Sequence, residues 1–149
     1  KQLGLARHIG VSNFTVALIE EAVAVCPEPL VCDQVEYHPY LDQIKVLEAC
    51  ARHQMAVVAY SPVAKGRLKS DRTLEQIGAR YGKTAAQVSL RWLVQQNVAA
   101  IPRTSRIERL SENLDIFDFA LSDDDMRRIF AMGSAKGRLT DFGFATKWD

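Results

Sequence analysis

Four apolar runs, each ending in a cluster of polar residues, constrain the fold of this chain more than any other feature of its sequence. The stretches between them have the spacing of amphipathic helices. A strand whose last residues turn polar just before a helix is typical of parallel α/β proteins, which bind ligands at the carboxyl edge of the sheet. The four runs are Ala6–Phe14, Leu30–Tyr40, Met55–Gly66 and Val98–Thr104.

The helix-like stretches between the runs give a predicted order of β-α-β-α-β-α-α-β-α-α. Right-handed crossovers turn such an order into a parallel sheet flanked by helices. A closed barrel of eight β/α units needs roughly 250 residues, whereas this chain has 149. We therefore expect an α/β fold of four β/α units. Residues 1–149 would form a single half-barrel segment that ends in a tail at residues 133–149.

Charge and composition exclude several kinds of partner. A net charge of +1 gives no reason to expect nucleic acid or a membrane surface as a partner. No apolar run approaches the ~20 residues that are needed to span a bilayer.

The three cysteines lack metal-ligand spacing, so we expect reduced thiols in a cytoplasmic protein. Because the chain begins at Lys1 rather than at a methionine, we also expect a fragment or a processed product.

Two capping boxes indicate where helices begin. The pair Thr84 and Gln87 and the pair Ser105 and Glu108 both have the spacing at which each side chain bonds the backbone N–H of the other. We expect one helix to open at each pair. In the second helix, three apolar residues follow on the side expected to face inward: Ile107, Leu110 and Leu114.

The end of the last apolar run carries the sharpest signal for a ligand. Arg103 and Thr104 follow this run directly, and Arg109 lies about one and a half turns into the next helix. A guanidinium, a hydroxyl and free backbone N–H groups are the donors that a phosphate requires. Glu112 and Asn113, one turn further, could hydrogen-bond a nucleotide base. The alternative is a capped surface helix with solvated arginines.

The other run ends supply neutral polar groups. Ser12, Asn13 and Gln34 offer donors and acceptors that suit an amide or carbonyl group, and the Tyr60 ring could stack on a flat heterocycle. Their structural alternatives are a core-edge aromatic for Tyr60 and a helix N-cap for Asn13.

Two titratable residues in the second run are assigned no chemistry. His38 is interpreted as a structural residue because no serine or cysteine nucleophile motif accompanies it. Glu36 could be a buried carboxylate at the end of a strand, but the sequence identifies no partner for it.

These polar run ends resemble the motifs of the aldo-keto reductase family, in the family's order and at its spacing. The resemblance extends from about Arg7 to Phe130, and bacterial-type members such as the diketogluconate reductase branch are the most similar. The motifs are Gly10-Val11-Ser12-Asn13-Phe14, Gln34-Val35-Glu36-Tyr37-His38-Pro39-Tyr40, Ala59-Tyr60-Ser61-Pro62, and Ile101-Pro102-Arg103-Thr104 with Arg109, Glu112 and Asn113.

The resemblance implies the second half of a (β/α)8 TIM barrel that binds NADP(H) and reduces small carbonyl compounds. It implies that Ser12, Asn13 and Gln34 hold the nicotinamide carboxamide and that Tyr60 stacks on the nicotinamide ring. The remaining family positions are Ser61, Val63 and Lys65 at the pyrophosphate, Arg103, Thr104 and Arg109 at the 2′-phosphate, and Glu112 and Asn113 at the adenine.

This sequence departs from the family pattern in two ways. Arg103 and Thr104 stand where the family more often has Lys-Ser. Arginine keeps the charge and adds a bidentate fork, so we expect NADP(H) to be preferred over NAD(H). The family's catalytic Asp, Tyr, Lys and His lie in the first half of the barrel, and none of those segments is in this sequence. The resemblance therefore predicts that this chain alone does not catalyse reduction.

Two functions remain open. The chain is either the cofactor-binding half of an NADP(H)-dependent reductase of small aldehydes or ketones, or a non-enzymatic half-barrel that binds nucleotide or self-associates. Its partner would be the missing N-terminal half or a second copy, because open strand edges favour pairing. In the tail, three aromatic residues could line a substrate pocket or merely pack against the barrel: Phe142, Phe144 and Trp148.

Overall fold

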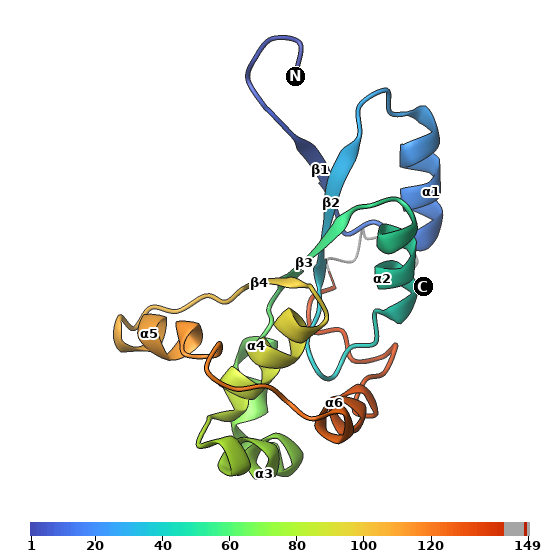
Figure 1. Ribbon diagram of the computed structural model, residues 1–149. Helices are drawn as coiled ribbons and strands as arrows, with labels where there is room; N and C mark the ends of the chain where they lie inside the picture. The colour runs from blue at the N-terminus through green and yellow to red at the C-terminus, as the bar shows by residue number, and fades with distance from the viewer. Residues whose placement is uncertain (142–147, 149) are drawn as a thin grey trace.

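Four parallel strands form a single sheet in the computed structural model, which describes residues 1–141 and residue 148 (Figure 1). The strands lie side by side in chain order, β1-β2-β3-β4, as expected when each crossover returns to the neighbouring position. They are β1 (Ile9–Ser12), β2 (Leu30–Glu36), β3 (Ala56–Tyr60) and β4 (Ala99–Ile101).

Helices connect the strands and flank the sheet, which confirms the predicted α/β class (Figure 1). One helix follows β1 and one follows β2, whereas a helical pair, α3 and α4, lies between β3 and β4. The elements are α1 (Val16–Val25), α2 (Ile44–Arg52), the 3-10 segment η1 (Ala64–Ser70), α3 (Arg72–Tyr81), α4 (Ala85–Gln95), α5 (Glu108–Leu114) and α6 (Asp123–Phe130).

The hydrophobic core fixes α4, the helix that leads into the last strand. Trp92 on α4 is 2% exposed, and its ring lies 4.9 Å from the ring of Tyr37 and 5.2 Å from that of Phe130 (centroid distances). Leu93 and Val88 on the same helix are fully buried. This packing joins α4 to the segment after β2 and to α6. No helix among the described residues is long and apolar enough to cross a membrane.

The capping box at the start of α4 is confirmed. The Thr84 hydroxyl accepts a hydrogen bond from the Gln87 backbone N–H at 3.3 Å, and Gln87 Oε1 accepts one from the Thr84 backbone N–H at 3.0 Å. Two of the N–H groups that a helix start leaves unpaired are thereby satisfied.

The second predicted capping box is wrong. Helix α5 begins at Glu108 without a side-chain cap in the described structure, and Ser105 does not open it. The Thr104 hydroxyl instead accepts from the Arg106 backbone N–H at 3.0 Å, which makes a local turn of this segment. Side chains such as threonine compete in this way with helix formation.

The expectation that α5 turns an apolar face inward is also wrong. Ile107, Leu110 and Leu114 are 76%, 53% and 70% exposed, and α5 itself buries no residue. Figure 1 shows α5 standing away from the sheet, beyond β4. Among the described strands, none lies beyond β4 for this helix to cover.

Candidate functional site

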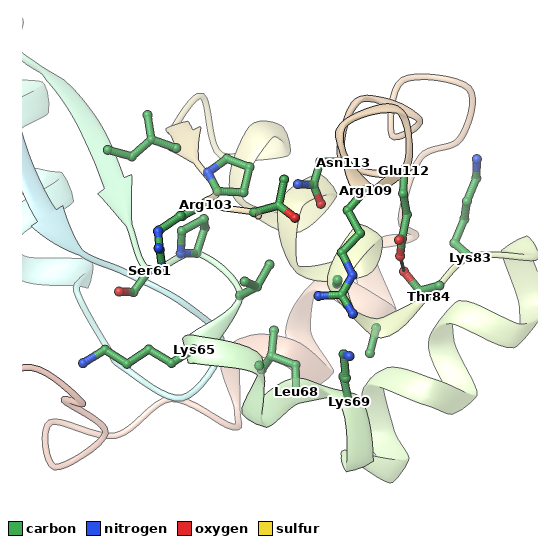
Figure 2. Close-up of a pocket in the computed structure, with 18 of the residues that line it drawn as sticks. Ser61, Lys65, Leu68, Lys69, Lys83, Thr84, Arg103, Arg109, Glu112 and Asn113 are labelled. Carbon is green, nitrogen blue, oxygen red and sulfur yellow. Dashed lines mark hydrogen bonds between the residues drawn. The ribbon is translucent and has the colours of Figure 1, made fainter. Parts of the chain in front are cut away.

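A cleft of about 1050 Å³ lies at the carboxyl ends of β3 and β4 (Figure 2). One wall comes from η1 and the residues just after β3, and the opposite wall from the end of β4 and α5. The carboxyl edge is where parallel α/β proteins place their sites. Eight of the twelve predicted ligand-binding residues line this cleft: Ser61, Val63, Lys65, Arg103, Thr104, Arg109, Glu112 and Asn113.

The other four predicted residues form a hydrogen-bonded cluster at the neighbouring strand ends. Ser12 Oγ and the Asn13 backbone N–H both donate to the backbone oxygen of Gln34, at 2.8 and 2.9 Å. The Tyr60 hydroxyl donates to Asn13 Oδ1 at 3.0 Å. These residues do not line the cleft, but Tyr60 is followed directly by Ser61, which does. The cluster therefore continues the cleft along the same edge.

Asn13 is not the N-cap of α1. Thr15 caps this helix, its hydroxyl accepting from the Leu18 backbone N–H at 3.4 Å. Asn13 has a left-handed backbone, with φ of 59°, a conformation that asparagine tolerates better than most residues. The turn at Asn13 leaves its side-chain amide available to Tyr60.

The loop after β3 is bent by a series of left-handed residues. Ser61, Ala64, Lys65 and Gly66 have φ values of 51°, 47°, 53° and 86°. Non-glycine residues in this region carry strain of order 1 kcal/mol each. Surrounding contacts must hold a strained loop of this kind in place. Several strained residues together beside a cleft therefore indicate a wall that is shaped for binding.

Ser89 on α4 holds this loop, and the sequence reasoning missed it. The Ser89 hydroxyl is fully buried and donates to the backbone oxygen of Pro62 at 2.6 Å. Leu68, 1% exposed, anchors the other end of the segment in the core. A serine inside the apolar stripe of α4 was the signal that could have revealed this contact.

Basic residues predominate on the walls of the cleft. Lys83 is already paired, its Nζ lying 2.8 Å from Asp115 Oδ2 and 2.8 Å from Asp118 Oδ2. Lys65 Nζ donates to the backbone oxygen of Leu139 at 3.1 Å. The walls carry five basic residues against two acidic ones: Lys65, Lys69, Lys83, Arg103 and Arg109 against Glu75 and Glu112.

Both arginines predicted to bind phosphate are free of carboxylate partners within the described part of the chain. Arg103 is exposed and Arg109 is half-buried, and neither takes part in an ion pair there. Figure 2 shows Arg103 extending towards Ser61 and Arg109 reaching from α5 across the cleft. Unpaired guanidinium groups in a concave site are suited to an anionic ligand.

Glu36 gains the partners that the sequence did not identify. Its carboxylate is fully buried at the end of β2 and accepts from the backbone N–H groups of Leu139 and Thr140, at 2.8 and 3.0 Å. His38 Nε2 lies 3.0 Å from Glu36 Oε1. Burial alone would raise the pKa of Glu36, but these hydrogen bonds lower it below its ordinary value.

Leu139 and Thr140, near the C-terminus, are thus held over the strand ends, next to Tyr60. Glu36 and Tyr60 are register partners on β2 and β3. Burial, followed by the nearby Glu36 charge, raises the pKa of Tyr60, so its hydroxyl keeps its proton. Of the tail aromatics, Trp148 lies against Arg138, whose guanidinium is 3.5 Å from the ring centroid. Phe142 and Phe144 lie outside the described residues.

Comparison with known proteins agrees with this geometry. The sequence profile described as "Aldo/keto reductase family" matches residues 1–133. This chain belongs to the aldo/keto reductase family. It is 40% identical over 135 residues to aldose reductase C of Dictyostelium discoideum, a match that covers 89% of this chain and 42% of that protein.

Solved structures match the fold over nearly the whole chain. One assigned to a 2,5-diketo-D-gluconic acid reductase B gives a TM-score of 0.96 at 45% identity, covering 99% of this chain and 53% of that one. A Bombyx mori aldo-keto reductase in complex with NADP gives 0.87 at 32% identity, covering 95% and 49%. The chain spans about half the length of these relatives, and its four parallel strands match part of their TIM barrel.

Proposed function

We propose that this chain provides the cofactor-binding part of an NADP(H)-dependent oxidoreductase that reduces small aldehydes or ketones to alcohols. The observation that carries this proposal is the cleft at the carboxyl edge, where the guanidinium groups of Arg103 and Arg109 form no ion pair with any described residue. Family membership and relatives solved with NADPH or NADP support it. The protein is proposed to act in the cytoplasm, with neither nucleic acid nor a membrane as a partner.

The donors in the cleft fit the adenosine half of this cofactor. Arg109 and Arg103 can form bidentate hydrogen bonds with a ribose 2′-phosphate, with the Thr104 hydroxyl beside them. Ser61, Val63 and Lys65 of the bent loop would contact the pyrophosphate. To do so, Lys65 would give up its hydrogen bond to the Leu139 backbone oxygen and donate to a phosphate oxygen instead. Glu112 and Asn113 on α5 would contact the adenine.

The hydrogen-bonded cluster fits the nicotinamide half. Ser12, Asn13 and Gln34 offer the donors and acceptors that a carboxamide pairs with. The Tyr60 ring, fixed by its hydroxyl bond to Asn13, would stack on the nicotinamide and determine which of its faces is presented. The bound cofactor would supply the hydride, and the residues of this chain would orient it.

A change at Arg109 tests the assignment of the 2′-phosphate. We expect Arg109→Ala and Arg103→Ala each to weaken NADPH binding by about tenfold or more, because a hydrogen bond to a charged group contributes ~1.5–3 kcal/mol. NADH, which lacks the 2′-phosphate, is expected to lose little. Isothermal titration calorimetry with both nucleotides measures the difference, and Arg7→Ala, an exposed arginine outside the cleft, is the control. Equal losses for NADPH and NADH would contradict the assignment.

The exposed apolar face of α5 supports the second proposal, which concerns partners. Leu110 and Leu114 project from α5, and Ile107 from the position just before it, each with more than half of its surface exposed. Apolar patches of this kind mark association surfaces. β1 and β4 are the two edges of the described sheet, and such edges pair readily. The remaining part of a barrel, or a second copy of this chain, would cover these surfaces.

We therefore expect the isolated chain to self-associate at micromolar concentration in sedimentation velocity. Leu114→Glu on the exposed face of α5 is expected to shift the distribution towards the monomer, since it places a charge in the contact. Glu48→Ala, an exposed change on α2, is the control and should leave the distribution unchanged. A monomer across the micromolar range for the unaltered chain would contradict this proposal.

A further inference from the structure

Lys69 is a basic residue of the cleft that none of the sequence motifs includes. It is exposed and lines the cleft from the η1 wall, whereas Arg109 lines it from α5. Figure 2 shows the Arg109 guanidinium reaching towards the part of η1 that carries Leu68 and Lys69. Two cationic side chains therefore approach the same part of the cleft from opposite walls.

Neither of these two cations is neutralised within the described part of the chain. No ion pair joins Lys69 or Arg109 to a carboxylate there. Of the two wall carboxylates, Glu112 accepts a hydrogen bond from the Thr84 hydroxyl at 3.0 Å, and Glu75 takes part in none of the ion pairs of the described residues. Facing cations repel each other, and an anion bound between them converts that repulsion into attraction.

The backbone around Lys69 is anchored on both sides. Leu68 is buried in the core, 1% exposed. Asp71 accepts from the Leu74 backbone N–H at 3.0 Å through Oδ1 and from the Tyr40 hydroxyl at 2.9 Å through Oδ2. Lys69 is therefore presented to the cleft from a stretch that is held in place by contacts at Leu68 and Asp71. Arg67, on the other side of Leu68, is also exposed but does not line the cleft.

We propose that Lys69 is a further binding residue for the cofactor, closing on its 2′-phosphate from the η1 wall opposite Arg109. This inference rests on the proposed function. A 2′-phosphate is a monoester and carries about −1.5 to −2 charge near neutral pH, more than either phosphate of the pyrophosphate diester. The 2′-phosphate is therefore the group of the cofactor that best matches two cationic side chains facing each other. The Lys69 ammonium is a point charge on a flexible stem and can follow the phosphate, whereas Arg109 fixes its orientation.

The test compares four nucleotides in calorimetric titrations of the unaltered chain and its variants. NADPH and 2′,5′-ADP carry the 2′-phosphate, whereas NADH and 5′-AMP lack it. Lys69→Ala is expected to weaken NADPH and 2′,5′-ADP about tenfold, the loss of one exposed charge-assisted hydrogen bond. NADH and 5′-AMP should change less than twofold. Lys69→Arg, which keeps the charge, should restore most of the affinity, and 1 M salt should reduce the difference.

Arg67→Ala is the matched control, because it removes an exposed cation from the same segment without touching the cleft. Equal losses for NADPH and NADH upon Lys69→Ala would overturn the inference, since they would place Lys69 at the pyrophosphate. Unchanged NADPH affinity in Lys69→Ala, alongside a loss in Arg109→Ala, would also overturn it while leaving the proposed function intact. If neither variant loses affinity, or the unaltered chain does not bind NADPH, the proposed function fails as well.

Discussion

Replacing Glu36 by alanine is expected to lower the free energy of unfolding by about 3–5 kcal/mol, the effect of removing one partner of a buried charged network. The Glu36 carboxylate is fully buried and holds the backbone N–H groups of Leu139 and Thr140. Each N–H left without an acceptor in a buried place costs about 1–3 kcal/mol. Arg138, whose Nη1 lies 3.8 Å from Glu36 Oε2, would also lose its opposite charge.

Urea denaturation followed by circular dichroism measures this loss, and trypsin cleavage after Arg138 reports release of the C-terminal segment. Glu36→Gln keeps one acceptor oxygen and should lose less than Glu36→Ala. Glu48→Ala, an exposed glutamate on α2, should change stability by less than about 0.5 kcal/mol. A Glu36→Ala variant as stable as this control would show that the buried contact does not hold the segment.

The same contact has a predicted pH dependence. Because the pKa of Glu36 is lowered in the folded chain, the folded state binds its proton less readily than the unfolded chain does. Its contribution to stability is therefore present above its ordinary pKa and is lost as the pH falls through the folded value. The stability difference between the unaltered chain and Glu36→Gln should shrink on acidification accordingly.

Asp33 is expected to produce a pH effect of the opposite sign. Its carboxyl is fully buried in β2 and accepts one long bond, 3.5 Å from the Phe14 backbone N–H, while Oδ2 has no hydrogen-bond partner among the described residues. Burial raises the pKa of Asp33 from 3.8 to about 6. The folded chain therefore binds the proton more tightly than the unfolded chain. The stability that the neutral Asp33 carboxyl contributes is fully present below pH 3.8 and is lost as the pH rises through about 6.

We expect Asp33→Asn to remove this loss. The rise in the pKa of Asp33 from 3.8 to about 6 corresponds to about 3 kcal/mol. The variant should therefore gain up to this amount over the unaltered chain near neutral pH and little at low pH. Chemical denaturation across the acid-to-neutral range measures the difference, which cancels the contributions of other carboxyls. Asp123→Asn, an exposed change at the start of α6, should give a difference that stays nearly flat. Parallel stability curves for Asp33→Asn and the unaltered chain would contradict the burial of an unpaired carboxyl.

Local chemistry made the strands and the cleft predictable. The strand positions and the capping box at Thr84 depend on neighbours within a few residues, so the pattern of residues is sufficient to predict them. The gathering of the ligand-binding candidates at one edge was predictable because the carboxyl ends of parallel strands meet there. Residues as distant as Ser61 and Arg109 consequently line one cleft.

Two predictions for α5 were wrong. One failed because two local hydrogen-bonding preferences competed, and the other because it depended on a neighbouring element to cover the helix. At Ser105 the capping pattern was present, but the Thr104 hydroxyl formed its own turn and α5 began later. The apolar spacing predicted a helix in this stretch, and α5 does form there, yet a spacing does not say whether another element will cover the apolar face. Leu110 remains exposed because the described fold offers no strand beyond β4.

By itself, the sequence determined the class of fold, the family motifs and the polar strand ends that meet at one edge of the sheet, because each depends on short-range pattern. Only the tertiary structure decided what those residues meet. Glu36 finds its partners more than a hundred residues away, Asp33 finds almost none, and Lys69 approaches the same part of the cleft as Arg109 from the opposite wall. Contacts between such distant segments form only when the whole chain packs, so no local pattern encodes them.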